Sequence, residues 1–196
     1  MEFEQVVRRR RMVRSFTPDP VPEEAVTRLV HNATHGPSAG NSQGHAFLVL
    51  DAATDLDRFW TVLIDMMPVV DSVRTAPLLL VPLTSRDAYL DRYAKPDKGW
   101  TDRDEGRWPV PYWHVDAGMA VLLALLTAVD EDLGALFFGI PAPKLDAFRA
   151  EFGVPAEYVP VGTLAVGYPD PQAPRSRPSQ PRRLTAEFVH HGRWGS

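Results

Sequence analysis

The chain has 196 residues, of which 44% are hydrophobic and 23% charged, and its formal net charge is −4. This length is enough for one domain with a sizeable core, and the small negative charge excludes whole-chain attraction to nucleic acid or to an anionic membrane. The sequence contains no cysteine, which excludes disulfides, thiolate catalysis and cysteine-ligated metal centres.

The N-terminal part of the chain predicts helices and one strand. We expect a short helix over residues 2–9 and a second helix that begins at Pro22-Glu23-Glu24, where carboxylates favour a helix N-terminus. The apolar run 46–50 predicts a strand. Residues 54–72 contain the next predicted helix, which Pro68 kinks or ends.

The middle of the chain contains the most apolar segments. Residues 78–83 predict a strand that is buried on both faces, and a short helix follows at 87–93. Residues 94–111 combine Lys, Asp, Gly, Pro and two Trp with little periodicity, which indicates a long loop or lid. The longest predicted helix, 112–133, is apolar almost all round, and this favours burial in a core or at a subunit interface.

The last third predicts a strand at 135–138, a helix at 144–152 and a strand at 159–166. Residues 169–181 contain five prolines and predict an extended arm. Because helices and strands do not alternate regularly, and because no glycine-rich fingerprint follows a strand, the order favours an α+β fold over a doubly wound sheet. We expect one domain over residues 1–196.

The location expected for the protein is the cytoplasm. Residues 1–5 include acidic side chains and lack an apolar signal core. The longest apolar run, 117–129, is too short for a confident membrane span. No metal site is predicted either: His31 and His35 are four residues apart on one predicted helix, but no third ligand is near them in the sequence.

Two arginines near the N-terminus are candidate anion ligands. Arg10 and Arg14 share a face whether the segment is helical or extended. Guanidinium groups form paired, charge-assisted hydrogen bonds to phosphate. A basic surface run that stabilises the preceding helix C-terminus is an alternative. Nucleic-acid binding by Arg8–Arg11 is another, although no aromatic stacking platform or second basic stripe accompanies it.

Two short motifs carry a resemblance to a known family. The first reads Arg10-Arg11-Met12-Val13-Arg14-Ser15-Phe16. The second follows after one helix-length, reads Pro37-Ser38-Ala39-Gly40-Asn41-Ser42-Gln43, and leads into the apolar run 46–50. Together, in this order and at this spacing, they resemble the FMN-binding signature of the nitroreductase family. Later segments also match the family: the long helix 112–133, the glycine in Phe137–Pro141 and the sequence Gly167-Tyr168-Pro169.

The resemblance implies a nitroreductase-like α+β fold, with a mainly antiparallel sheet flanked by helices and the long helix at a homodimer interface. It also implies which residues would bind the phosphate and ribityl chain of FMN. Arg10 and Arg183 would pair with the phosphate, with Arg182 as the alternative to Arg183. Arg11 and Met12 would line the ribityl chain, partly through their backbone.

The resemblance further implies the surroundings of the isoalloxazine ring. Arg14 would face its pyrimidine end and is the candidate for stabilising the reduced flavin. Gly139 would lie near N5, where the missing side chain allows close backbone approach. The ring would be covered by four residues of the partner subunit: Pro37, Ser38, Ala39 and Asn41.

Two positions depart from the family pattern. Met12 stands where the family has a serine, so a hydroxyl contact is lost and only a backbone contact can be kept. Gly44-His45 stands where the family often has Pro-Trp, which changes the lining near the ring.

The implied activity is ping-pong oxidoreduction, in which NADPH or NADH reduces the flavin and a nitroaromatic, quinone or similar planar acceptor then takes the same place. The cofactor supplies the redox chemistry, and the protein supplies binding and orientation. The lid contributes large amphipathic surfaces suited to a planar substrate: Trp100, Trp108, Tyr112 and Trp113. Burial of Tyr112 and Trp113 at the start of the core helix is an equal alternative.

Two alternative functions stay open. The same fold could carry a different flavin reaction, as in a dehydrogenase or a flavin-fragmenting dimethylbenzimidazole synthase. The protein could also be a flavin-binding or sequestering module without turnover.

Overall fold

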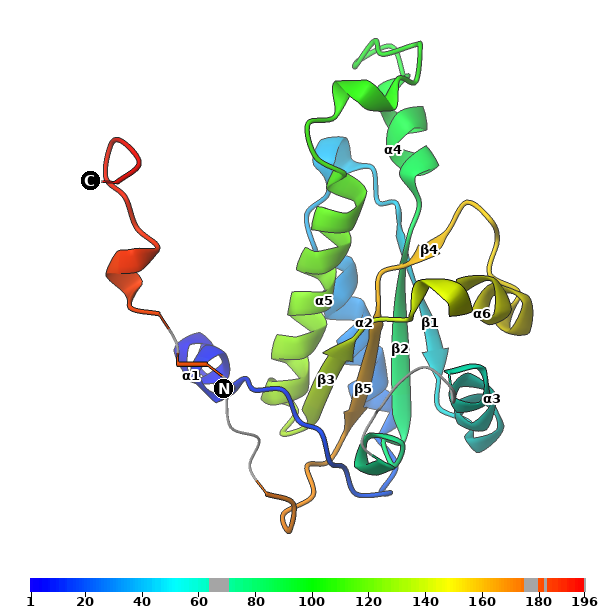
Figure 1. The fold of residues 1–196 in the computed structure, drawn as a ribbon, viewed down its shortest axis with the longest axis vertical. Helices are drawn as coiled ribbons and strands as arrows, with labels where there is room; N and C mark the ends of the chain where they lie inside the picture. The colour runs from blue at the N-terminus through cyan, green and yellow to red at the C-terminus, as the bar shows by residue number, and fades with distance from the viewer. Residues whose placement is uncertain (64–70, 175–179, 182, 196) are drawn as a thin grey trace.

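The protein is described here by a computed structural model, which places residues 1–63, 71–174, 180–181 and 183–195. The sheet contains β1 (His45–Leu50), β2 (Leu78–Thr84), β5 (Thr163–Gly167) and β3 (Gly134–Phe138) in that order, and each neighbouring pair is antiparallel. A short strand, β4 (Val159–Pro160), pairs with the end of β2 (Figure 1). The antiparallel sheet expected for the fold is therefore confirmed.

Helices cover both faces of this sheet. On one face lie α2 (Glu23–Thr34) and α5 (Tyr112–Asp130), and on the other lie α3 (Ala53–Leu63) and α6 (Leu145–Phe152). Two further helices lie outside this arrangement: α1 (Phe3–Arg9) contacts α5, and α4 (Arg86–Tyr93) projects with the following loop beyond the end of the sheet (Figure 1).

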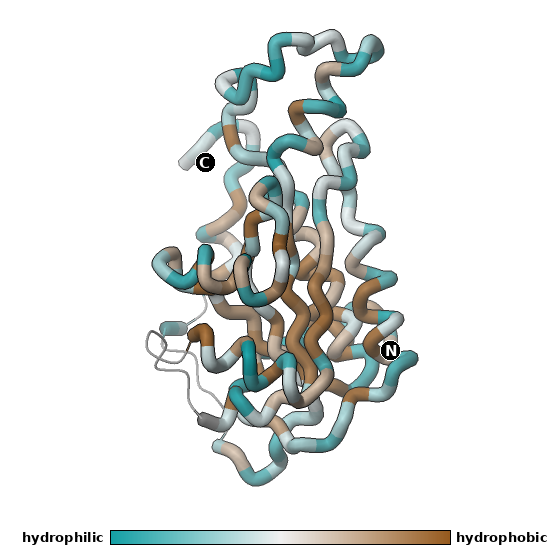
Figure 2. Tube along the Cα trace, turned by 90° about the vertical axis from the view of Figure 1, so that its right-hand side faces the viewer, coloured by the Kyte–Doolittle hydropathy of each residue, from teal (hydrophilic) through white to brown (hydrophobic). Residues whose placement is uncertain are grey.

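The central strand β2 explains why the fold has three layers. Leu78 and Leu80 pack into the cluster under α2 and α5, whereas Leu79 and Val81 pack into the cluster under α3 and α6. Side chains alternate between the two faces of a strand, so an unbroken apolar run buries both. Figure 2 shows the strands as a hydrophobic centre and the projecting segment as largely hydrophilic. The predicted two-sided burial of residues 78–83 is confirmed.

The predicted strand 159–166 is wrong in one respect, because it is divided into β4 and β5. Between the pairs Leu83–Pro160 and Leu80–Leu164, three steps along β2 match four steps along the other strand. One extra residue on one strand is a β-bulge. Gly162 lies within it, and a Cβ built there would be 2.5 Å from the Phe137 ring.

The end of one predicted helix differs in the structure, and the end of another is not described. α5 ends at Asp130 rather than at residue 133, because Asp132 is left-handed (φ 55°) and turns the chain into β3. The described part of α3 is Ala53–Leu63; the rest of the predicted helix 54–72 falls mainly on 64–70, outside the described residues, and 71–73 form a 3₁₀ turn.

One side of α5 faces outward. Five of its exposed or half-buried apolar side chains follow a spacing of three and four residues, and they are Tyr112, Val115, Met119, Leu122 and Leu126. By length and hydropathy α5 could cross a membrane, and it is the one helix in the described ranges that could. Half of it is nevertheless buried within the fold, and core helices of water-soluble proteins meet the same criteria.

Candidate functional site

The arginine-containing segment after α1 crosses one end of the sheet. The backbone N–H of Val13 donates to the Ala135 carbonyl at the start of β3, over 2.9 Å. The N–H of Thr17 donates to the Tyr168 carbonyl just after β5, also over 2.9 Å. Residues 13–17 are thus fixed to the sheet by backbone hydrogen bonds, which hold the intervening side chains in a defined place.

A cleft of about 750 Å³ opens beside this segment, and we call it the N-terminal cleft. Ser72 donates from Oγ to the Arg14 carbonyl over 2.8 Å, and Asp170 donates from its N–H to the Ser15 carbonyl over 3.0 Å. These bonds hold its walls, which are formed by Arg11, Met12, Val13, Arg14, Ser15, Ser72, Pro169, Asp170, Pro171, Ala173 and Pro174. The volume falls within the range of small-molecule and cofactor sites.

The arginines at this end of the molecule differ in their partners. Arg8 and Arg9 form ion pairs with Glu4 and Asp132. Within the described ranges no carboxylate pairs with Arg10 or Arg11. Two of the four arginines considered for nucleic-acid binding are therefore already neutralised, whereas positive charge remains beside the cleft. The guanidinium groups of Arg10 and Arg11 are therefore available as hydrogen-bond donors to an anionic ligand.

The second motif forms a loop beside the N-terminal end of α5, and we call it the 37–44 loop. Ala39 donates its N–H to Oδ2 of Asp116, near the start of α5, over 2.8 Å. Arg92 of α4 donates from Nε to the Gly40 carbonyl over 2.8 Å. A Cβ built on Gly40 would lie 2.7 Å from the Tyr93 ring, so only glycine fits beneath that ring.

The backbone of this loop is conformationally unusual. Gly40, Asn41 and Gln43 have φ values of 61°, 54° and 51°. Non-glycine residues with positive φ are uncommon, and such conformations gather at ligand-binding and active sites. The two left-handed non-glycine residues therefore point to a functional role for the 37–44 loop.

The two motifs are far apart within one chain. Ala39 is bound to Asp116 at one end of α5, whereas Val13 lies against Gly134, just beyond the other end. From Asp116 to Asp130 the helix rises about 21 Å. The N-terminal cleft and the 37–44 loop of one chain therefore cannot both contact the same flavin ring.

The remaining residues predicted to contact the cofactor lie outside both features. Gly139 directly follows β3, is exposed, and has open space around its Cα, because a Cβ built there meets no atom within 4 Å. Arg183 forms an ion pair with Glu187 (3.0 Å) and lies over the Phe188 ring. The described contacts of Arg183 do not include Arg10, and its phosphate role stays a prediction. Arg182 lies outside the described residues.

The lid has a compact interior of aromatic rings. The centroids of five aromatic rings lie within 6.2 Å of the Trp108 ring centroid, and these rings belong to Tyr89, Tyr93, Trp100, Tyr112 and Trp113. Trp113 is 5% exposed and Tyr112 36% exposed. The burial alternative therefore holds for Trp113, while Tyr112 stays partly accessible.

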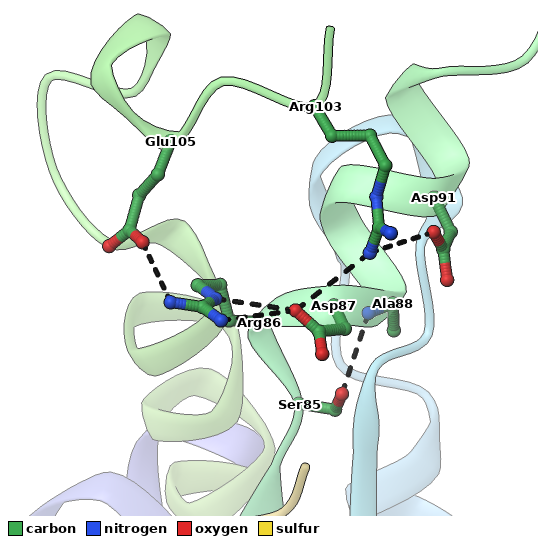
Figure 3. Close-up of polar contacts among 7 residues, drawn as sticks. All are labelled: Ser85, Arg86, Asp87, Ala88, Asp91, Arg103 and Glu105. Carbon is green, nitrogen blue, oxygen red and sulfur yellow. Dashed lines mark hydrogen bonds and ion pairs between the residues drawn. The ribbon is translucent and has the colours of Figure 1, made fainter. Parts of the chain in front are cut away.

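Ion pairs join the lid to α4 on the outside (Figure 3). Arg86 pairs with Glu105 over 2.9 Å, and Arg103 pairs with Asp91 over 3.0 Å. Below them lies a second cleft of about 690 Å³, whose lining includes Arg86, Glu105, Trp113 and His114. The lid is thus a folded unit with a cleft at its base.

Sequence reasoning missed the residues that hold the 37–44 loop. Asp116 is 2% exposed and accepts hydrogen bonds from Ala39 and from the Tyr89 hydroxyl. Burial, and then the bond to Asp116, raise the pKa of Tyr89, so its hydroxyl stays protonated and donates. The available signal was a single carboxylate within an otherwise apolar stretch of helix.

Comparisons with known proteins agree with this fold. A family model described as the nitroreductase family matches residues 7–168. One relative, a protein of Methanothermobacter thermautotrophicus provisionally named NADH dehydrogenase/NAD(P)H nitroreductase, is 23% identical over 172 residues, which are 86% of this chain and 78% of that protein.

Solved structures resemble the chain over nearly its whole length. A provisionally named nitroreductase from Desulfovibrio desulfuricans, solved in complex with FMN, is 25% identical with a TM-score of 0.67, covering 96% of this chain and 95% of that one. NfrA2 of B. megaterium is 17% identical with a TM-score of 0.77, covering 99% of this chain and 75% of that one, and shows a likeness of fold alone.

Proposed function

Because the chain belongs to the nitroreductase family, we propose that it is an FMN-dependent NAD(P)H oxidoreductase that works as a homodimer. Each flavin would lie between the N-terminal cleft of one protomer and the 37–44 loop of the other. The observation that carries this proposal is the placement of the two motifs at opposite ends of α5. A second, antiparallel copy would bring the two ends together, as a two-fold dimer does.

The outward face of α5 supports a dimer. Val115 and Leu122 are 45% and 48% exposed, and with Tyr112, Met119 and Leu126 they form an apolar stripe with the spacing of a coiled-coil seam. Exposed apolar stripes of this kind favour association with another surface. A copy of the same helix offers the same stripe, so a two-fold pairing would cover both.

The N-terminal cleft, together with Arg10 directly before its first lining residue, fits the phosphate and ribityl end of FMN. Arg10 would hold the phosphate, with Arg183 or Arg182 as its partner, and Arg11 and Met12 would line the ribityl chain. The donor set is suitable because a guanidinium group forms paired hydrogen bonds to phosphate, and Arg10 and Arg11 have no carboxylate partner among the described residues.

The ring would be positioned by elements of both protomers. Arg14 would place positive charge at the pyrimidine end, where it favours the reduced cofactor. Gly139 would admit the ring closely because no side chain fills the space around its Cα. Pro37, Ser38, Ala39 and Asn41 of the other copy would cover the ring.

FMN held at this site would supply redox chemistry between NADPH or NADH and an acceptor. The acceptor proposed is a nitroaromatic, a quinone or a similar planar compound, because the lid presents Trp100, Trp108 and Tyr112 beside a cleft that Trp113 helps to line. The cytoplasm remains the location we expect.

The visible spectrum tests this function. Purified protein incubated with FMN and desalted should show flavin absorption, which should disappear on adding NADPH or NADH without oxygen and return on adding a quinone or nitroaromatic. Protein that retains no FMN would overturn the proposal. Protein that binds FMN but is not bleached by either nicotinamide would support the sequestering alternative instead.

A further inference from the structure

A buried carboxylate connects three segments that are distant in the sequence. Oδ2 of Asp116 accepts the Ala39 N–H over 2.8 Å and the Tyr89 hydroxyl over 2.8 Å. Asp116 itself is 2% exposed. A single oxygen atom of α5 thus binds the backbone of the 37–44 loop and the side chain of α4.

From this arrangement we propose that Asp116 is a positioning residue, which fixes the 37–44 loop where it can cover the flavin of the partner protomer. The inference rests on the proposed function for its consequence in flavin binding. Its first part, that Asp116 determines the position of the loop, concerns the protein without cofactor and can be tested separately.

The cost of burying a charge indicates that Asp116 has a specific task. A carboxylate loses hydration when it is buried, and only well-formed hydrogen bonds offset that loss. Asp116 is the fifth residue of α5, close to the helix N-terminus, where the helix dipole favours negative charge. The site is therefore tolerable for a carboxylate, and both described donors to it come from outside α5.

The other contacts of the loop show why this bond matters. Arg92 holds the Gly40 carbonyl, but Arg92 also makes a two-pronged ion pair with Asp97 in the lid, over 2.9 and 2.7 Å. This second attachment therefore joins the 37–44 loop to the lid rather than to the sheet. Asp116 belongs to α5, whose buried face packs on the sheet, and so it ties Ala39 to the rigid body of the fold.

Tyr89 extends the same connection toward the lid. Its hydroxyl shares Oδ2 of Asp116 with the loop, while its ring lies 6.1 Å from Trp108 and 6.2 Å from Trp113, centroid to centroid. A Cβ built on Gly44 would be 2.6 Å from the Tyr89 ring, so the end of the loop also packs against this tyrosine. Asp116 and Tyr89 together set the distance between the loop and the aromatic interior of the lid.

Four variants separate positioning from general stability. Asp116→Ala removes the acceptor, whereas Asp116→Asn keeps a carbonyl oxygen that can accept both hydrogen bonds. Ala39→Pro removes the donor of the same bond at a position preceded by the extended residue Ser38. Thr127→Val is the matched control, because Thr127 is buried in α5 and bonded to Asn32 of α2, but does not contact the loop.

Hydrogen exchange of the cofactor-free protein gives the first readout. We expect Asp116→Ala and Ala39→Pro to speed exchange in peptides covering residues 38–44, and we expect Asp116→Asn and Thr127→Val to leave these peptides unchanged. If Asp116→Ala does not fold, Ala39→Pro carries the test from the other side of the bond. Unchanged exchange in the variants that lack the bond would overturn the inference.

FMN titration gives the second readout. We expect Asp116→Ala to raise the Kd for FMN about tenfold, the scale of one lost hydrogen bond with an unsatisfied buried partner, and Asp116→Asn to restore it to within about threefold of the wild type. A wild type that binds no FMN would contradict the proposed function and leave the exchange result to decide the positioning role. A wild type and Asp116→Ala with equal Kd would overturn the flavin consequence of the inference.

Discussion

Gly134 and Val13 pack so closely that a Cβ built on the glycine would lie 2.7 Å from Cγ2 of the valine. Gly134 begins β3, and Val13 stands between Met12 and Arg14 in the N-terminal cleft. A side chain at position 134 would therefore push the arginine-containing segment away from the sheet. The missing side chain of this glycine thus sets the position of the segment whose residues are proposed to bind the phosphate and ribityl chain of FMN.

We expect Gly134→Ala to lower the free energy of unfolding by about 1–3 kcal/mol, as overpacking of a tight contact does, and to weaken FMN binding. Denaturant unfolding and FMN titration measure the two effects. The double variant Val13→Gly/Gly134→Ala removes every Val13 side-chain atom that the new methyl would meet, and it should recover part of both losses. If Gly134→Ala behaves like the wild type, the close contact does not position the cleft.

The outward stripe of α5 leads to a prediction about assembly. Leu122→Glu places a charge at the middle of the stripe, where pairing with a second copy would bury it without a partner. Because Leu122 is 48% exposed in the protomer, the fold itself should tolerate the change. We expect light scattering to report a monomer and FMN affinity to fall, whereas Leu122→Met should remain dimeric. A Leu122→Glu dimer would place the interface elsewhere.

His45 should make the protein sensitive to mild acid. Burial lowers the pKa of His45 from its usual 6.5, and the nearby Asp116 raises it by less. Since the unfolded chain then binds the proton more readily than the folded one, stability should fall as pH drops below about 6.5 and continue to fall until the lowered folded pKa is passed.

Replacing this histidine tests that sign. We expect the free energy of unfolding of the wild type to decline more than that of His45→Gln between about pH 7.5 and 5, because the variant has no group to protonate at this position. Comparing the two proteins cancels the effects of the other titrating groups. Parallel pH profiles would show that burial of His45 does not alter its protonation.

The lid should depend on its aromatic interior rather than on its ion pairs. Arg86 and Glu105 are each about half exposed, and exposed pairs contribute at most about 1 kcal/mol. Trp108 contacts five rings, and its removal should cost up to about 3 kcal/mol. We therefore expect Trp108→Ala to loosen the lid in limited proteolysis and to raise KM for a quinone, while Glu105→Gln resembles the wild type. If Glu105→Gln loosened the lid more than Trp108→Ala, the surface ion pairs rather than the aromatic interior would hold the lid together.

Local patterns were sufficient to predict most elements, and they failed where distant residues decide the structure. The apolar composition of residues 78–83 predicts burial of β2 on both faces, because alternation along a strand is a local property. The bulge between β4 and β5 could not be predicted in this way. It depends on the Phe137 ring above Gly162 and on how β2 pairs with two strands at once.

The residues of the candidate site also differ in how far the sequence alone could identify them. The arginine and loop motifs could be found because their residues are contiguous in the sequence, and the resemblance assigned both to one flavin. Asp116 stands out as a carboxylate in an apolar helix, but its role could not be predicted, because its partners Ala39 and Tyr89 are 77 and 27 residues away. The separation of the two motifs along α5 likewise became visible only in the folded chain.

Mixed dimers test most directly whether one flavin site is built from two copies. A cleft variant, Arg10→Ala/Arg14→Ala, and a loop variant, Ser38→Ala/Asn41→Ala, should each lose FMN as homodimers. A heterodimer of the two, isolated through different affinity tags, has one site with all the substitutions and one with none, so we expect it to bind about one FMN per dimer. A heterodimer that binds no FMN would contradict a site shared between two protomers.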